Sequence, residues 1–114
     1  MRRSILLCLV TFAGCSKGPQ ADLQFISQAR SLAAEWAMVN RQASEDKLTR
    51  AYVQSMRQSL REQVQTASQA LTVPDSDYAK EIDALKAEPQ DAPADALRAH
   101  ADRLKQIEDR LESA

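Results

Sequence analysis

The near absence of glycine is the feature that most constrains what this chain can fold into. Only two glycines occur among its 114 residues, and no glycine follows Gly18. The chain also lacks the Asn-Gly and Asp-Gly pairs that mark tight β-hairpins, and it contains no run of strand-like alternation. Alanine, leucine, glutamine, arginine and glutamate are abundant, and all of them favour helix. The sequence therefore predicts an all-α protein.

Apolar residues recur at spacings of three and four along four segments, as they do on the buried face of a helix. The first helix is predicted over 22–43, with Asp22 as its N-cap, and the second over 50–71, after an N-cap at Thr49. Residues 44–49 interrupt the pattern without a glycine or a proline. Two helices, or one long kinked helix over 22–71, are therefore both compatible with this part of the sequence.

Prolines separate the remaining helices. Pro74 ends the second one, because proline cannot continue the helical hydrogen-bond ladder. A short third helix is predicted from a cap at Asp75 or Ser76 through Ala87. A turn with two prolines follows over 88–93, and the last helix then runs to about residue 113, with Asp91 as its cap.

The apolar stripes predict which side chains form the core. They are Phe25, Ile26, Ala29, Leu32, Ala33, Trp36, Ala37, Val39 and Ala43 in the first helix, Val53, Met56, Leu60, Val64, Ala67 and Leu71 in the second, Tyr78, Ile82 and Leu85 in the third, and Leu97, His100, Leu104, Ile107 and Leu111 in the last. We expect a small antiparallel bundle of three longer helices and one short one. The last helix is expected to pack on the first two helices of its own chain, because an isolated helix of this length is marginal in water.

The first residues predict secretion. A basic start at Arg2 and Arg3 is followed by an apolar run over 5–12, which is shorter than the roughly 20 residues that span a bilayer as a helix. The small pair Ala13-Gly14 then precedes Cys15. This is the pattern of a signal peptide, and an ordinary signal peptide would not require the cysteine.

The stretch Phe12-Ala13-Gly14-Cys15 resembles the lipobox of bacterial lipoproteins. The resemblance implies that residues 1–14 are removed as a signal peptide and that Cys15 becomes a lipidated N-terminus carrying palmitate-type acyl chains. Ser16, which is not an aspartate, implies sorting to the periplasmic face of the outer membrane; the alternatives are the inner membrane and secretion. Residues 15–21 would be the tether and 22–114 the helical domain.

Composition limits the possible partners and chemistry. Cleavage before Cys15 removes two arginines and changes the formal charge from -1 to -3, with 13 basic and 16 acidic residues remaining. This mild acidity gives no indication of nucleic-acid binding. Cys15 would be the only remaining cysteine, so no disulfide is expected. Stability must then come from packing.

No catalytic or metal-binding constellation is recognisable in the sequence. His100 is the only histidine, and residues three and four positions away on its helix are not metal ligands, so we expect it to be packed in the helix seam. The stretch "DSDYAK" over 75–80 begins like a calcium loop but lacks its glycine and its final glutamate. We therefore predict no enzyme activity, no cofactor, no metal and no small-molecule substrate.

Two features are candidates for partner binding. Lys47, Arg50, Arg57 and Arg61 share one side of the second helix. They form either a basic stripe for an acidic partner or a solvated face paired with Asp77, Glu81 and Asp83. Trp36 is either an interface anchor or a core residue. The expected function is a structural or protein-interaction lipoprotein; the alternative is a tethered binding module, such as an inhibitor, an exclusion factor or an accessory subunit of an envelope complex.

Overall fold

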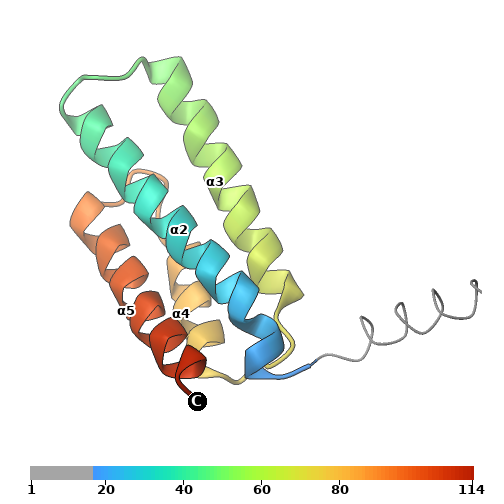
Figure 1. Cartoon of the computed structure of the whole chain (residues 1–114). Helices are drawn as coiled ribbons and strands as arrows, with labels where there is room; N and C mark the ends of the chain where they lie inside the picture. Colours follow the sequence, from blue (N-terminus) through green and yellow to red (C-terminus); the bar gives the residue numbers. More distant parts are fainter. Residues whose placement is uncertain (1–16) are drawn as a thin grey trace, which may run out of the picture.

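A computed structural model describes residues 17–114 as four helices that run alternately up and down (Figure 1). With the labels of Figure 1, they are α2 (Pro19–Ser44), α3 (Arg50–Ala70), α4 (Asp77–Lys86) and α5 (Ala94–Glu112). The described part of the chain contains no strand. The predicted all-α bundle of three longer helices and one short helix is confirmed.

The helix α2 begins three residues earlier than predicted. Its N-cap is Gly18, with a φ of 101° that favours glycine, and Pro19 occupies the first helical position. The prediction of Asp22 as the N-cap is therefore wrong. Asp22 lies inside the first turn, and its carboxylate accepts hydrogen bonds from residues that are distant in the sequence. A proline at the first helical position costs no hydrogen bond, which explains the earlier start.

The predicted cap of α3 is confirmed, and of the two candidates for the cap of α4, Asp75 and Ser76, the structure shows Ser76. The Thr49 side chain accepts a hydrogen bond from the Tyr52 amide at 3.2 Å, and the Ser76 side chain accepts one from the Ala79 amide at 3.2 Å. The cap of α5 differs from the prediction. Pro93 is the N-cap and Asp91 lies two residues before it, so the carboxylate of Asp91 does not cap the helix.

The connection between α2 and α3 explains how the chain reverses without glycine. Asp46 adopts a φ of 58°, the left-handed conformation that usually requires glycine at the end of a helix and that aspartate tolerates. The Lys47 amide then donates to the Gln42 carbonyl at 3.0 Å, which closes the end of α2. The chain turns here, so α2 and α3 are two antiparallel helices (Figure 1), and the alternative of one long kinked helix is wrong.

The helix α2 is the centre of the bundle, because it packs most extensively against the other two long helices, α3 and α5, and also contacts the short α4. Its buried face is correspondingly wide and includes Ile26, Ala29, Ala33, Trp36 and Ala37, all of them essentially inaccessible to solvent. The alanines let neighbouring helices approach closely. The helix α5 packs along α2 and α4, but α5 and α3 do not touch. The predicted packing of the last helix on the first is thus present, and the predicted packing on the second is absent.

The remaining core matches the predicted stripes closely. Its buried apolar members outside α2 are Val53, Leu60, Val64, Ala67, Tyr78, Ala79, Ile82, Leu85, Ala92, Leu97, Ala101, Leu104 and Ile107. Met56, Leu71 and Leu111 are partly buried against this core.

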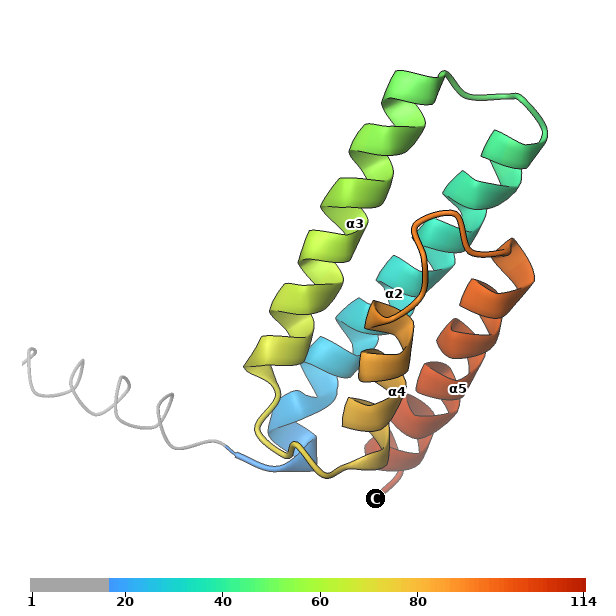
Figure 2. The ribbon, with the colours of Figure 1, turned by 180° about the vertical axis from the view of Figure 1, so that it is seen from behind.

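The shortness of α4 shapes one end of the molecule. With 10 residues against 21 in α3, it lies beside only the lower part of the α2–α3 pair. Figure 2 shows the chain leaving α4 as an extended loop that climbs to the start of α5. Because α3 and α5 do not touch, nothing helical fills the space above α4.

The predicted signal peptide, Cys15 and Ser16 lie outside the described residues, whereas the other residues of the predicted tether, 17–21, are described and include the start of α2 at Pro19. Within residues 17–114, none of the four helices combines the length and the apolar character that a membrane-crossing helix needs.

Candidate functional site

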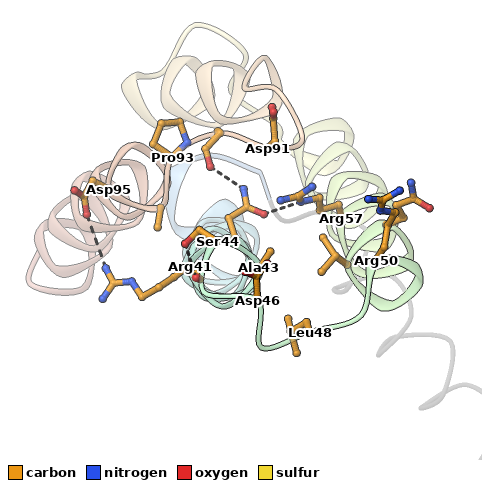
Figure 3. A pocket seen from close by; sticks show the side chains of 15 residues that line it. Arg41, Ala43, Ser44, Asp46, Leu48, Arg50, Arg57, Asp91, Pro93 and Asp95 are labelled. Atoms are coloured by element: carbon orange, nitrogen blue, oxygen red, sulfur yellow. Dashed lines mark hydrogen bonds and ion pairs between the residues drawn. The ribbon is translucent and has the colours of Figure 1, made fainter.

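The open space above α4 forms a cleft of about 1130 Å³, which we call the distal cleft. It lies between the C-terminal end of α2, the N-terminal half of α3 and the loop that leads into α5 (Figure 3). Its lining residues are Asn40, Arg41, Ala43, Ser44, Asp46, Leu48, Arg50, Val53, Gln54, Arg57, Asp91, Ala92, Pro93, Ala94 and Asp95. Gly18 lies at the opposite end of α2, so the cleft is far from the point where the chain enters the bundle.

Two side chains of α2 fix the loop that forms one wall of the cleft. The Asn40 amide donates to the carbonyls of Gln90 at 3.0 Å and Ala92 at 2.7 Å. The Trp36 indole donates to the same Gln90 carbonyl at 2.9 Å. Trp36 is fully buried, which places the predicted candidate anchor in the core beneath the cleft. The wall is therefore preorganised by the polar groups of two buried side chains.

The structure divides the predicted basic stripe. Arg50 and Arg57 line the distal cleft, whereas Lys47 pairs with Glu45 at 3.1 Å and Arg61 donates to the Lys86 carbonyl at 3.4 Å, both outside it. Arg57 is held in place because its Nε donates to the side-chain oxygen of Asn40 at 2.8 Å. Two guanidinium groups on one wall are thus available to a partner.

The acidic residues predicted to pair with the stripe are engaged elsewhere. Asp77 pairs with Arg110 at 2.8 Å, Glu81 with Arg103 at 2.8 Å, and the carboxylate of Asp83 lies 3.7 Å from Lys86. Among residues 17–114, no carboxylate lies within ion-pair distance of the Arg50 and Arg57 guanidinium groups.

The cleft also carries negative charge. Asp91 lies on the loop wall of the cleft (Figure 3), and Asp95 pairs loosely with Arg41 at 3.8 Å. With Asp46, the lining contains three arginines and three aspartates, so its formal charge is balanced. A surface with separated charges of both signs and apolar lining residues such as Val53 and Ala92 suits a polypeptide better than a simple anion.

The opposite end of the bundle is closed by a buried carboxylate. Asp22 is inaccessible to solvent and accepts hydrogen bonds from the Thr72 amide at 3.0 Å, the Thr72 hydroxyl at 2.9 Å and the Val73 amide at 3.2 Å. The Tyr78 hydroxyl donates to the same carboxylate at 2.7 Å, and the Gly18 amide donates to the Thr72 hydroxyl at 2.9 Å. These bonds join the start of α2 to the α3–α4 connection and to α4.

This carboxylate affects the titration of its tyrosine neighbour. Burial, together with the hydrogen bond to Asp22, raises the pKa of Tyr78 to about 12, from an ordinary value of 10.0. Both effects disfavour a phenolate, because the phenolate would be desolvated and would lie beside another negative charge. Tyr78 therefore stays a hydrogen-bond donor across the whole neutral range.

The most concentrated group of titratable side chains surrounds His100, between α4 and α5. Its ring nitrogens lie 2.5 Å from a carboxylate oxygen of Glu81 and 2.7 Å from one of Glu88. Arg103 donates to the other oxygen of Glu81 at 2.8 Å. We call these four residues the His100 cluster. The two glutamates approach different ring nitrogens, and the described residues contain no group of three or more histidine, cysteine, aspartate or glutamate side chains arranged to hold a metal ion.

Sequence reasoning missed both the His100 cluster and the role of Asp22. Spacing along a helix relates His100 only to residues of its own helix, whereas its partners come from α4 and the residue that follows its end. One sequence signal was present. Glu81 and Glu88 are seven residues apart, which is two helical turns, and a tight proline turn folds their segment back onto the helix of His100. For Asp22, the sequence held no comparable signal.

Comparison with known proteins found no matching family model, no similar curated protein and no similar solved structure.

Proposed function

We propose that this protein is a small bacterial lipoprotein whose helical bundle is held at the periplasmic face of the outer membrane by lipid on Cys15, and that it binds an envelope protein through the distal cleft. The observation that carries the proposal is that the entry of the chain into the bundle and the distal cleft lie at opposite ends of the bundle. Gly18 is bonded into one end through Thr72, and the cleft opens at the other end.

Distances along the chain support this arrangement. Cys15 is three residues from Gly18 in the sequence, a span of at most about 11 Å. Asn40, at the floor of the cleft, follows Gly18 by 22 residues of helix, which corresponds to about 33 Å along the axis. A lipid on Cys15 would keep the Gly18 end near the membrane, and the cleft would then point into the periplasm. Two or three acyl chains hold a protein to a bilayer firmly.

The cleft favours an interaction role over a purely structural one. A purely structural bundle gains nothing from leaving α4 short and two guanidinium groups without carboxylate partners. Arg57 is preorganised by Asn40, and arginine is enriched in the energetically dominant positions of protein interfaces. The partner contact is therefore expected at the α3 wall of the cleft, near Arg50 and Arg57, and not at Trp36, which is buried.

The anchor is tested by labelling cells with a clickable fatty acid. The wild-type protein should carry the label and sediment with outer membranes. The variant Cys15→Ser should lose both properties, and retention of label by this variant would contradict the lipoprotein assignment.

The cleft is tested with a photo-crosslinking residue in intact cells. Gln54 lines the cleft, whereas Gln65 is equally exposed on the same side of α3, three turns away. The photo-crosslinking residue at Gln54 should give a discrete crosslinked species, and the additional substitution Arg57→Gln should reduce its yield. The same residue at Gln65 should give no such species. Equal crosslinking at both positions, or none at Gln54, would reject the cleft as the binding surface while leaving the anchor intact.

A further inference from the structure

The α3 wall of the distal cleft presents two arginines at a defined spacing (Figure 3). Arg50 and Arg57 are seven residues apart, which is about two helical turns, so both project from the same side of α3. Their backbone positions are about 10.5 Å apart along the helix axis. Val53 and Gln54 lie between them in the sequence and also line the cleft. The wall is thus a stripe of two cations with an apolar side chain between them.

The two arginines lack acidic partners within the bundle. Arg50 is the first residue of α3, and the first turn of that helix contains no acidic side chain. A cation at this end of a helix is unfavourable, because it lies near the positive end of the helix dipole. Among residues 17–114, no carboxylate lies within ion-pair distance of Arg50 or Arg57. Residues 1–16 contain no aspartate or glutamate, so that segment has no carboxylate side chain to offer them.

The rest of the cleft restricts where a partner can carry negative charge. Asp91 and Asp95 line it from the loop and from the start of α5, and the Asp95 side chain is 97% exposed. A partner that is acidic on all sides would be repelled by these carboxylates while it is attracted to α3. The charge pattern of the cleft therefore fits a partner segment whose acidic side chains are confined to one flank.

The spacing of the arginines distinguishes a helical partner from an extended one. In a helix, residues seven apart share one face and are about 10.5 Å apart, which matches the spacing of Arg50 and Arg57. In a strand, side chains on one face are about 6.7 Å or about 13 Å apart, and neither value matches. Arg57 cannot adjust freely, because its Nε donates to the side-chain oxygen of Asn40 at 2.8 Å.

We propose that the distal cleft binds an amphipathic helix of a partner protein, with two acidic side chains seven residues apart that pair with Arg50 and Arg57. This inference rests on the proposed function, because it names what the proposed binding surface recognises. An apolar residue three or four positions after the first acidic side chain faces Val53. Recognition of this kind places the apolar face of a helix in a groove and uses the flanking charges for specificity.

A second copy of this chain offers a comparable acidic stripe on α5. Asp95, Asp102 and Asp109 are exposed and recur at intervals of seven residues. Two of these three carboxylates already have basic partners, since Lys105 lies 3.1 Å from Asp109 and Arg41 lies 3.8 Å from Asp95. The proposal is therefore a helix of another protein, and self-association is one outcome of the test.

The probes are three synthetic peptides of equal length and charge, added to the ¹⁵N-labelled full chain in detergent. In the first, a hydrocarbon bridge on the far side holds a helix with two glutamates seven residues apart and a leucine between them. The second has the same bridge, but its glutamates are four residues apart, about 6 Å along the axis. The third has the first spacing, no bridge and a central proline, which prevents a continuous helix.

The first peptide should shift the NMR signals of the backbone amides over 50–57 and 91–95 and leave those of Thr72 and Val73 unchanged. It should bind about fivefold more tightly than the other two, because an exposed ion pair contributes up to about a factor of five in affinity. Equal affinities of the three peptides, or no shift with the first, would overturn the proposal. The same shifts with an equal concentration of inorganic phosphate would also overturn it, because the arginines would then bind any anion.

Variants test whether the two arginines act directly. Arg50→Gln and Arg57→Gln should each weaken binding of the first peptide about fivefold. Arg98→Gln, which removes an exposed arginine of α5 outside the cleft, should leave the affinity unchanged. In Arg50→Glu, a peptide with lysine in place of one glutamate should bind more tightly than the original peptide, a rescue that a loss of folding cannot produce. Undiminished binding by Arg50→Gln or Arg57→Gln would contradict the proposal.

Further outcomes separate this inference from the proposed function. A crosslink from Gln54 in cells, together with equal affinities of the three peptides, would reject the helical partner and leave the proposed function intact. Selective binding of the first peptide without any crosslink would support the recognition chemistry and reject the cleft as the binding surface in cells. Shifts of the same amides with protein concentration alone would assign the cleft to a second copy and overturn the proposal.

Discussion

At each end of the bundle, one buried polar side chain of α2 joins neighbouring segments, but the two side chains differ in charge. At the Gly18 end, a fully buried carboxylate, Asp22, collects bonds from Thr72, Val73 and Tyr78 and ties three segments together. At the distal end, a neutral amide, Asn40, ties α2 to the α5 loop and to Arg57. The charged groups of the distal end face the cleft, whereas the charge of the Gly18 end is enclosed.

The difference shows which polar groups are enclosed in the bundle and which remain in contact with water. A buried carboxylate is tolerated only when several donors surround it, so its neighbours must be fixed in place. An amide demands less, and it allows the adjacent arginines and aspartates to keep contact with water. The polar groups of the Gly18 end are therefore enclosed and held by several bonds, whereas the charged groups of the distal cleft keep contact with water, which is what the proposed binding role requires. Four predictions, from the largest expected effect to the smallest, test this contrast.

Removal of the buried carboxylate should have the largest effect. In Asp22→Ala, the two backbone amides and the two hydroxyl groups that donate to it lose their acceptor inside the protein. Because buried donors without partners are costly, we expect a loss of about 3 to 5 kcal/mol in the free energy of unfolding, measured by urea titration. Asp91→Ala, an exposed aspartate of the distal cleft, is the control and should be nearly neutral. Similar losses in both variants would remove the contrast between the ends.

Alkaline pH should weaken the Gly18 end selectively. Tyr78 has a pKa of about 12 in the folded protein, above the ordinary value of 10.0, so the folded state holds the phenolic proton more tightly. The resulting stability is complete below pH 10 and is lost as the pH rises from 10 through about 12. The loss should be of the order of 2 kcal/mol in urea titrations across this range. Tyr78→Phe should be less stable at pH 8 and should lack this alkaline loss. An identical pH profile in the two proteins would contradict the assignment.

Removal of the distal amide should have a smaller effect. Asn40→Ala takes one donor from the Gln90 carbonyl, which keeps its bond to Trp36, and removes the bonds to Ala92 and Arg57. Water can replace part of these bonds at the open cleft, so we expect a loss of about 1 to 2 kcal/mol. Hydrogen exchange should rise in residues 88–93 and stay unchanged at Thr72 and Val73. A loss as large as that of Asp22→Ala would show that the distal end is equally rigid.

The ion pair at the rim of the cleft should have the smallest effect. Arg41 and Asp95 are both exposed and 3.8 Å apart, a geometry that contributes little in water. Arg41→Ala should leave the urea midpoint unchanged within error, while it should alter crosslinking from Gln54 if the partner uses this rim. A clear loss of stability would mean that the rim belongs to the folded core and not to the binding surface.

The sequence by itself determined the helices. The spacing of apolar residues, the caps at Thr49 and Ser76 and the breaks at Pro74 and over 88–93 are local signals, because a helix bonds to itself within four residues. The buried positions of α3, α4 and α5 followed from the same spacing. The break between α2 and α3 was visible but ambiguous, since aspartate adopts the left-handed conformation of Asp46 only when the surrounding fold favours it.

Only the tertiary structure decided which helices touch and which polar side chains meet. Asp22 and Thr72, Asn40 and Gln90, and His100 and Glu81 are separated by 50, 50 and 19 residues, so no local pattern joins them. The central position of α2 buried Trp36, and the absence of contact between α3 and α5 opened the distal cleft. The physical reason is that apolar periodicity specifies which face of a helix is buried, whereas the partner of each buried polar group depends on how the helices are arranged around one another.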